Sequence, residues 1–166
     1  MATPATRQPL PPATYLARGH VFEDFTPGHV FEHALRKTVL AAESALFTSL
    51  TLHYNPLYLD RVRAVELGYR DTPINALLVF NLVFGLTVED LSEGGGPFLG
   101  IEGLTYGEPV YDGDTLHARS TVIAARPSSK HPDFGIVTWE SVGANQRDGS
   151  VVVYRRSNLV RRGTAA

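Results

Sequence analysis

The stretch from Pro73 to Leu91 limits the possible folds of this chain more than any other feature. It is apolar on nearly every face of a helix, and only Asn81 interrupts its longest apolar run, residues 76–86. That run is far shorter than the roughly 20 residues that a membrane span needs. A helix that is apolar all round is buried by other structure. We therefore expect a soluble domain in which one long helix is wrapped by the remaining elements.

The chain after the glycines at 94–96 is dominated by segments typical of β-strands. β-branched residues recur at alternate positions, and Asp148-Gly149 is a hairpin turn signal. An earlier segment, 29–36, also alternates between apolar and polar residues, while 37–50 and 57–67 suit helices. The strands expected after the glycines cover residues 98–106, 115–126, 134–145 and 151–160. This order predicts an α+β fold, with a long apolar helix lying on a curved antiparallel β-sheet.

The length of 166 residues suits one domain. We assign residues 1–27 to an N-terminal arm and irregular entry, 28–162 to the single domain, and 163–166 to a tail. Residues 1–12 are rich in Pro, Ala and Thr and lack the apolar core of a secretory signal.

Composition excludes several classes of function. The net charge of −2 gives no general attraction to nucleic acid or to an anionic membrane. The absence of cysteine excludes disulfides, thiolate metal sites and a thiol nucleophile, and it fits the cytoplasmic location that we expect. His29 and His33 lie four residues apart, but no carboxylates complete a set of ligands, so we expect no metal site.

Two segments carry a recognisable motif. Phe47-Thr48-Ser49-Leu50-Thr51, followed by Asn55-Pro56-Leu57 and Asp60, is similar to the hydratase motif of the MaoC-like dehydratases, the (R)-specific enoyl-CoA hydratases of the hot-dog fold. The segment 109–116, Pro-Val-Tyr-Asp-Gly-Asp-Thr-Leu, resembles a strand motif of the same family. The resemblance covers residues 28–161.

The resemblance implies the hot-dog fold, a homodimer with a shared pocket, and an acyl thioester substrate. The acyl carrier would be coenzyme A or the phosphopantetheine of an acyl carrier protein, and no other cofactor is implied. The family pattern places a Gly-Asp pair before Asn-Pro and a His two residues after the Pro, with Asp and His acting as general acid and base. In this chain Leu52, His53 and Tyr58 occupy those three positions.

The predicted catalytic residues are His53, Tyr58 and Asn55. Hydration requires one group that takes a proton from water and another that delivers a proton to the α-carbon. A histidine can do either, whereas a tyrosine phenol, with an unperturbed pKa of about 10, suits only donation. Asn55 would support a water molecule by hydrogen bonding. Each of the three also has a structural reading, as a core or surface side chain or a turn residue.

The predicted substrate-binding residues are Asn75, Ala76 and Asn81. In the family, a backbone N–H at the start of the long helix holds the enolate oxygen, and Asn75 and Ala76 occupy the matching positions. Free N–H groups at a helix start suit that task. Asn81 would face the acyl tunnel or a dimer interface. The arginines at 155, 156, 161 and 162 would meet the phosphates of coenzyme A or remain solvated.

Three functions stay open on the sequence. The first is a lyase, a hydratase or dehydratase acting on an enoyl or 3-hydroxyacyl thioester. The second is a thioesterase on the same fold, although such enzymes more often use a carboxylate, and none lies in the motif. The third is an inactive subunit that binds acyl thioesters, which the replacement of both family catalytic residues favours.

Overall fold

A computed structural model describes residues 19–163. Residues 1–18 of the predicted arm and irregular entry (1–27) and residues 164–166 of the predicted tail (163–166) lie outside the described residues. The elements in chain order are η1 (Phe22–Asp24), β1 (Val30–Glu32), β2 (Lys37–Thr38), α1 (Ala41–Leu50), η2 (Pro56–Tyr58), α2 (Arg61–Glu66), α3 (Ala76–Leu86), α4 (Val88–Leu91), β3 (Phe98–Tyr106), β4 (Thr115–Pro127), β5 (Phe134–Ala144) and β6 (Ser150–Arg161).

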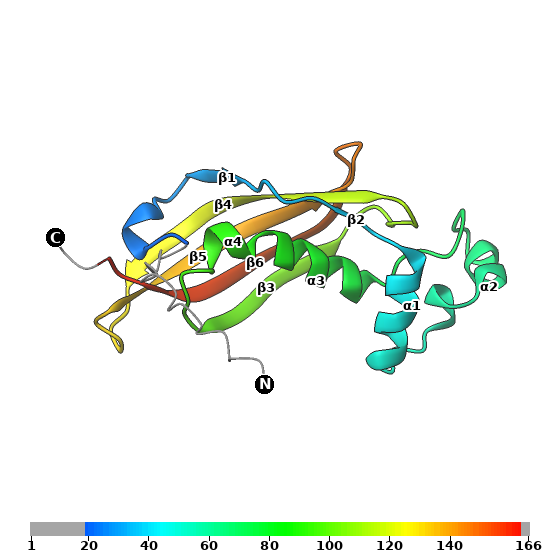
Figure 1. The fold of residues 1–166 in the computed structure, drawn as a ribbon, viewed down its shortest axis with the longest axis horizontal. Coiled ribbons are helices and arrows are strands. Elements are labelled where there is room, and N and C mark those ends of the chain that lie inside the picture. The colour runs from blue at the N-terminus through cyan, green and yellow to red at the C-terminus, as the bar shows by residue number, and fades with distance from the viewer. Residues whose placement is uncertain (1–18, 164–166) are drawn as a thin grey trace, which may run out of the picture.

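The strands form a six-stranded antiparallel sheet in the order β1-β4-β5-β6-β3, and β2 pairs with the beginning of β4. Helix α3 lies along one face of this sheet, while α1, η2 and α2 gather at one end of the molecule (Figure 1). The predicted α+β fold, with a long apolar helix on a curved antiparallel sheet, is confirmed. The four strands expected after the glycine run also appear, each with ends within one residue of the predicted ones.

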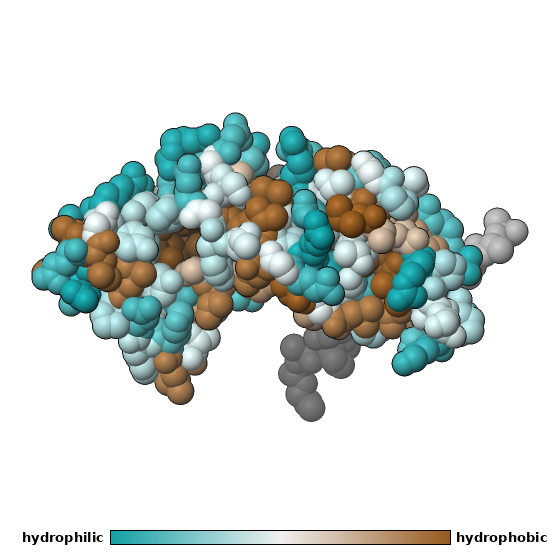
Figure 2. Space-filling model, turned by 180° about the vertical axis from the view of Figure 1, so that it is seen from behind, coloured by the Kyte–Doolittle hydropathy of each residue, from teal (hydrophilic) through white to brown (hydrophobic). Residues whose placement is uncertain are grey.

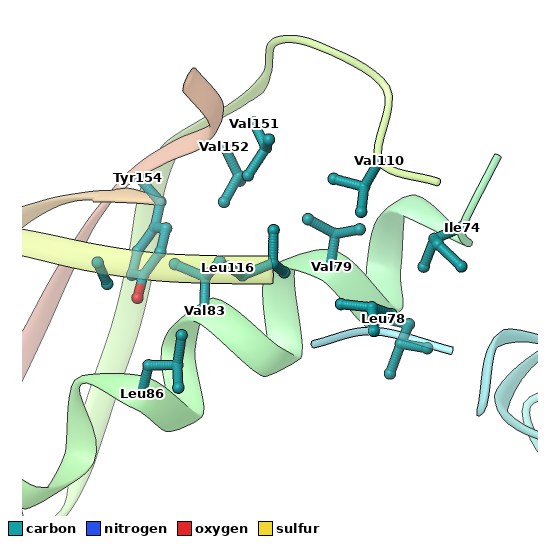
Figure 3. Packing of buried hydrophobic residues seen from close by; sticks show 12 residues of the cluster. Ile74, Leu78, Val79, Val83, Leu86, Val110, Leu116, Val151, Val152 and Tyr154 are labelled. Carbon is teal, nitrogen blue, oxygen red and sulfur yellow. The ribbon is translucent and has the colours of Figure 1, made fainter. Parts of the chain in front are cut away.

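The main core lies between α3 and the sheet. Figure 3 shows Val79, Val83 and Leu86 of α3 on the side of the helix that meets Leu116 and Tyr154 of the sheet. The contact with β5 is close because residue 143 is a glycine: a Cβ there would lie 2.5 Å from Cγ2 of Val83. The aromatic rings of Phe80 and Phe84 pack against Tyr154 at 5.1 and 6.1 Å between centroids. Apolar burial of this kind is what holds the helix on the sheet.

The helix differs from the expectation in one respect. Leu77, Asn81 and Gly85 follow one another at intervals of four residues and form an exposed stripe along α3. Leu77, the apolar side chain of this stripe, keeps 41% of its surface accessible. The prediction that the helix is wrapped on all sides is therefore wrong for this stripe in the single chain. Within residues 19–163, the chain forms no helix with the length and apolarity that crossing a bilayer requires.

The sequence pattern predicts one strand over residues 29–36, but the structure has no continuous strand there. β1 ends at Glu32, although the N–H of His33 still donates to the carbonyl oxygen of Ala118 in β4, and the buried imidazole of His33 bonds to Asp90 and Ser120. Lys37 and Thr38 then pair with β4, so the helix expected over 37–50 begins only at Ala41. The contacts of this segment with β4 and α4 are tertiary, and the local sequence pattern does not contain them.

The residues expected to form an irregular entry pack on the far end of the sheet instead. Phe25 is buried, and its ring meets Trp139 edge to face at 5.1 Å. Phe22 covers Gly135, where a Cβ would come within 2.0 Å of the phenyl ring. Together with Leu91 and Val160 they form a second, smaller core.

Candidate active site

A cavity of about 210 Å³ lies where the start of α3 meets η2 and the loop that follows β3. Part of its wall is apolar and includes Ile74, Val79, Val110 and Val151, which Figure 3 labels within the main core. The lining residues with polar side chains are Tyr58, Tyr69, Tyr106 and Glu108. The lining residues are Leu57, Tyr58, Tyr69, Pro73, Ile74, Ala76, Val79, Tyr106, Gly107, Glu108, Pro109, Val110 and Val151.

The motif segment brings Tyr58 to this cavity through a tight turn. Leu52 adopts a left-handed conformation with φ of 56°, which reverses the chain after α1. The side-chain oxygen of Asn55 accepts a hydrogen bond from the N–H of Leu57 at 3.0 Å, and Pro56 fills the first position of η2. Asn55 does not line the cavity, and its observed contact is that of a cap.

His53 lies directly beside Tyr58, as expected from the motif. The two ring centroids are 5.6 Å apart with a 53° angle between the planes. His53 is half-buried and does not line the cavity, whereas Tyr58 and Ala76 do. Its Nδ1 lies 3.1 Å from Nδ2 of Asn75.

Asn75 and Ala76 stand at the start of α3 with different surroundings. The N–H of Asn75 donates to Oγ of Ser44 at 2.9 Å, so it is engaged inside the protein. The N–H of Ala76 has no hydrogen-bond partner among the described residues, and Ala76 lines the cavity. Of the two predicted donors at the helix start, the geometry therefore leaves Ala76 for a ligand.

Asn81 lies away from the cavity, on the exposed stripe of α3. Its Nδ2 donates to the carbonyl oxygen of Leu77 at 2.7 Å, one turn earlier in the same helix. The polar side chain thus finds a partner within its own helix.

Three lining residues with polar side chains, Tyr69, Tyr106 and Glu108, were not identified from the sequence. Glu108 precedes the second motif by a single position, and its Oε2 accepts a hydrogen bond from Nδ2 of Asn145 at 3.1 Å. Tyr106 is the last residue of β3, and burial together with the nearby Tyr58 phenol raises the pKa of Tyr106. The sequence carries one signal for Glu108, which is its position directly before Pro109.

The arginines near the C-terminus are engaged within the protein at three of the four positions. Arg155 pairs with Glu140 at 2.9 Å and Arg162 with Glu23 at 3.1 Å. Arg156 is buried, with its guanidinium 4.5 Å from the centroid of Phe84, and it cannot reach a phosphate at the surface.

The two histidines considered as metal ligands have other neighbours. The ring of His29 packs against Phe31 at 4.6 Å, and His33 is bonded inside the protein. Across residues 19–163, no group of three or more His, Asp or Glu side chains is arranged to hold a metal ion.

Comparison with known proteins gives consistent matches. A family model described as mesaconyl-CoA hydratase matches residues 4–166. The mesaconyl-CoA hydratase of Haloarcula marismortui is 38% identical over 148 residues, which are 87% of this chain and 41% of that protein. The chain thus spans less than half the length of this relative.

Solved structures agree on the fold. A MaoC domain dehydratase from Chloroflexus aurantiacus superimposes with a TM-score of 0.85 at 38% identity, over 93% of this chain and 44% of that one. A Mycobacterium tuberculosis protein with a double hotdog fold gives a TM-score of 0.78 at 21% identity, over 89% and 46% of the two chains. This chain therefore has the hot-dog fold, and it belongs to the mesaconyl-CoA hydratase family of MaoC-like proteins.

Proposed function

We propose that this chain forms an acyl-thioester site of a hydratase or dehydratase, which adds water to an enoyl-CoA or removes it from a 3-hydroxyacyl-CoA. The observation that carries the proposal is the cavity at the start of α3, where Tyr58 of the hydratase motif and the unpartnered N–H of Ala76 meet. Family membership supports the same reaction.

The cavity offers what the reaction requires of a protein. Water adds to a double bond conjugated with the thioester, so negative charge develops on the thioester oxygen. A backbone N–H at a helix start, in a place shielded from bulk water, stabilises such charge. In the proposal the N–H of Ala76 performs this task, with the partial positive end of α3 behind it.

Proton transfer falls to side chains around the same cavity. Tyr58 can donate through its phenol, and the neighbouring His53 supports it from outside the wall. Glu108 adds a carboxylate at the cavity, and a carboxylate can act as a general base. The proposed chemistry is acid-base only, so it requires no cofactor beyond the coenzyme A of the substrate.

The proposed substrate is a short acyl thioester of the mesaconyl-CoA kind. A cavity of about 210 Å³ suits a small acyl group, and the hydroxyls of Tyr58, Tyr69 and Tyr106 suit one with polar atoms. The names of the relatives favour coenzyme A over a carrier protein. A cytoplasmic location is part of the proposal, and the absence of cysteine is compatible with it.

We further propose that a second hot-dog domain, from another copy of this chain or from a related chain, completes the site. The length of the relatives supports this, since the chain covers 44% of the Chloroflexus aurantiacus structure and 46% of the double hotdog one. Apolar side chains also reach the surface at the end of the molecule formed by α1 and α2 (Figure 2). They include Leu46, Leu50, Leu52, Val62 and Val65, all more than half exposed.

A second candidate function is that of a binding domain without catalysis. His53 and Tyr58 replace the family's Asp and His, and His53 does not reach the cavity wall. In that case the second hot-dog domain would carry the catalytic residues.

One experiment separates the candidates. The purified chain is incubated with mesaconyl-CoA and with short enoyl-CoAs, and the products are analysed by mass spectrometry. Gain of one water supports the hydratase, release of free coenzyme A indicates a thioesterase, and tight binding without reaction indicates the binding domain. Light scattering of the same sample gives the number of chains in the assembly. A chain that neither binds nor converts any of these thioesters contradicts the proposal.

A further inference from the structure

Asn75 occupies a buried position between three elements of the candidate site. Its side chain contacts α1 through Thr48, the motif segment through His53, and the first turn of α3 through Leu77. The residue has no accessible surface. Its hydrogen bonds therefore face no competition from water, and their directions are fixed by the protein alone.

The orientation of the Asn75 amide follows from a backbone group. The N–H of Leu77 can only donate, and it lies 3.0 Å from Oδ1 of Asn75. The other end of the amide is therefore the NH₂ group. Its two hydrogens are directed to Oγ1 of Thr48 at 2.9 Å and to Nδ1 of His53 at 3.1 Å. The orientation of the amide is thus fixed independently of the histidine.

The Asn75 amide in turn determines the tautomer of His53. An NH₂ group has hydrogens to give and accepts none, so Nδ1 of His53 must present its lone pair. In a neutral imidazole the proton then resides on Nε2. Nε2 has no hydrogen-bond partner among the residues that the structure describes.

We infer that Asn75 is a positioning residue that holds His53 as the Nε2–H tautomer, so that His53 serves the site as a hydrogen-bond donor and not as the base. This inference rests on the proposed function for its catalytic meaning. With Nδ1 occupied by the Asn75 amide, the neutral ring can donate through Nε2–H but has no free lone pair with which to act as a base. The role of base then falls to another group, and Glu108 is the carboxylate at the cavity.

The test is the tautomer itself, measured on the intact chain labelled with ¹⁵N-histidine. Long-range ¹H–¹⁵N spectra distinguish Nδ1–H from Nε2–H rings, and comparison with His53→Gln identifies the His53 signals among the six histidines. His33 serves as an internal reference, because its Nδ1 faces the carboxylate of Asp90 and is expected to carry the proton. We expect the Nε2–H pattern for His53 in the wild-type chain, and an Nδ1–H pattern overturns the inference.

Two variants test the cause. Asn75→Asp keeps an oxygen for the N–H of Leu77 but replaces the NH₂ group by an acceptor, so Nδ1 of His53 should become protonated. Thr48→Val removes the other partner of the amide and should leave the His53 pattern unchanged. Should Asn75→Asp fail to fold, Asn75→Ser keeps a helix cap and should give a mixture of tautomers. A folded Asn75 variant that retains the wild-type pattern contradicts the assignment.

These spectra do not depend on catalysis. A correct tautomer in a chain that hydrates no thioester would refute the proposed function and leave the role of Asn75 intact. Hydration by a chain whose His53 is in the Nδ1–H form would support the proposed function and refute the role of Asn75.

Discussion

Nδ1 of His33 lies 2.6 Å from Oδ2 of Asp90, and this contact joins the end of β1 to α4 across 57 positions of the chain. The other ring nitrogen lies 2.8 Å from Oγ of Ser120, which in turn lies 2.7 Å from Oγ of Ser141. The imidazole, which has no accessible surface, thus connects the helical layer to two strands of the sheet. A buried network of this kind is costly to leave half-satisfied.

This network predicts how stability depends on pH. Burial lowers the pKa of His33 below its ordinary value of 6.5, and it outweighs the opposing effects of Asp90 and Glu32, while Arg156 acts in the same direction as burial. The unfolded chain therefore binds a proton at a higher pH than the folded chain does. Stability should be level above the unfolded pKa and should fall as the pH drops through about 6.5.

Urea unfolding at about pH 7.5 and 5.5 measures this effect, and His33→Gln should show a weaker dependence on pH. Glu23, Glu32, Glu43 and Asp71 have lowered pKa values, so their contribution is lost only as the pH falls below their ordinary values of 4.5 and 3.8. The two pH windows are thus separate. A free energy of unfolding that does not change between the two pH values would contradict the prediction.

The buried Arg156 gives a second prediction. Burial lowers its pKa to about 10, and its guanidinium lies between the rings of Phe84 and Trp139 at 4.5 and 5.4 Å. Nε and Nη1 have no hydrogen-bond partner within residues 19–163, and Nη2 has a long contact of 3.4 Å to the carbonyl oxygen of Thr87. An apolar side chain of similar length avoids the cost of burying this charge.

Arg156→Met should therefore be as stable as the wild type or more stable. Arg156→Ala loses the packing as well and should cost about 2–5 kcal/mol of unfolding free energy. Chemical denaturation measures both values. If Arg156→Met were less stable than the wild type, the charge of Arg156 would contribute to the stability of the fold.

The contact between α3 and β5 gives a third prediction. Gly143→Ala would place a methyl group against Val83 and should cost about 1–3 kcal/mol. Val83→Ala makes room for that methyl group, so the double variant should be more stable than the sum of the two single changes allows. Gly100→Ala is the matched control, because nothing lies within 4 Å of a Cβ at that strand position. Additive effects at 143 and 83 would show that the two sites do not press on each other.

The sequence predicted the second half of the fold well for a local reason. The strands β3 to β6 carry β-branched residues at alternating positions, and glycines and prolines separate them. Helix α3 was equally recognisable from its continuous apolar side chains. In the first half, the segment after β1 contacts α4 through His33 and Asp90, and no local pattern contains that contact.

The candidate site was predictable in part for a similar reason. The motif located Tyr58 and the start of α3, since both lie in segments with a recognisable order of residues. Glu108 and Tyr106 join them only because the end of β3 folds back over the start of α3. The hydrogen bond between Asn75 and His53 likewise depends on a tertiary approach that residue spacing does not encode.

The last prediction concerns hydration activity. Tyr58→Phe removes only the phenol oxygen from the cavity, and Glu108→Gln removes only the charge. If these groups transfer protons, each change should lower kcat by about 100- to 10,000-fold, because a positioned acid or base contributes that much. The free energy of unfolding should stay close to that of the wild type, since Glu108 is exposed and the phenol oxygen of Tyr58 makes no hydrogen bond to the described residues.

Matched controls for these two changes lie nearby in the chain. Tyr54→Phe alters an exposed tyrosine of the same motif segment, and Glu102→Gln alters an exposed carboxylate of β3, and neither residue lines the cavity. Both controls should retain the wild-type rate of mesaconyl-CoA hydration. The rate is measured from the decrease in absorbance of the enoyl thioester. Equal losses in the controls and in the cavity variants would assign the effect to stability. Unchanged rates in Tyr58→Phe and Glu108→Gln would place the chemistry outside this cavity and favour a second hot-dog domain as its location.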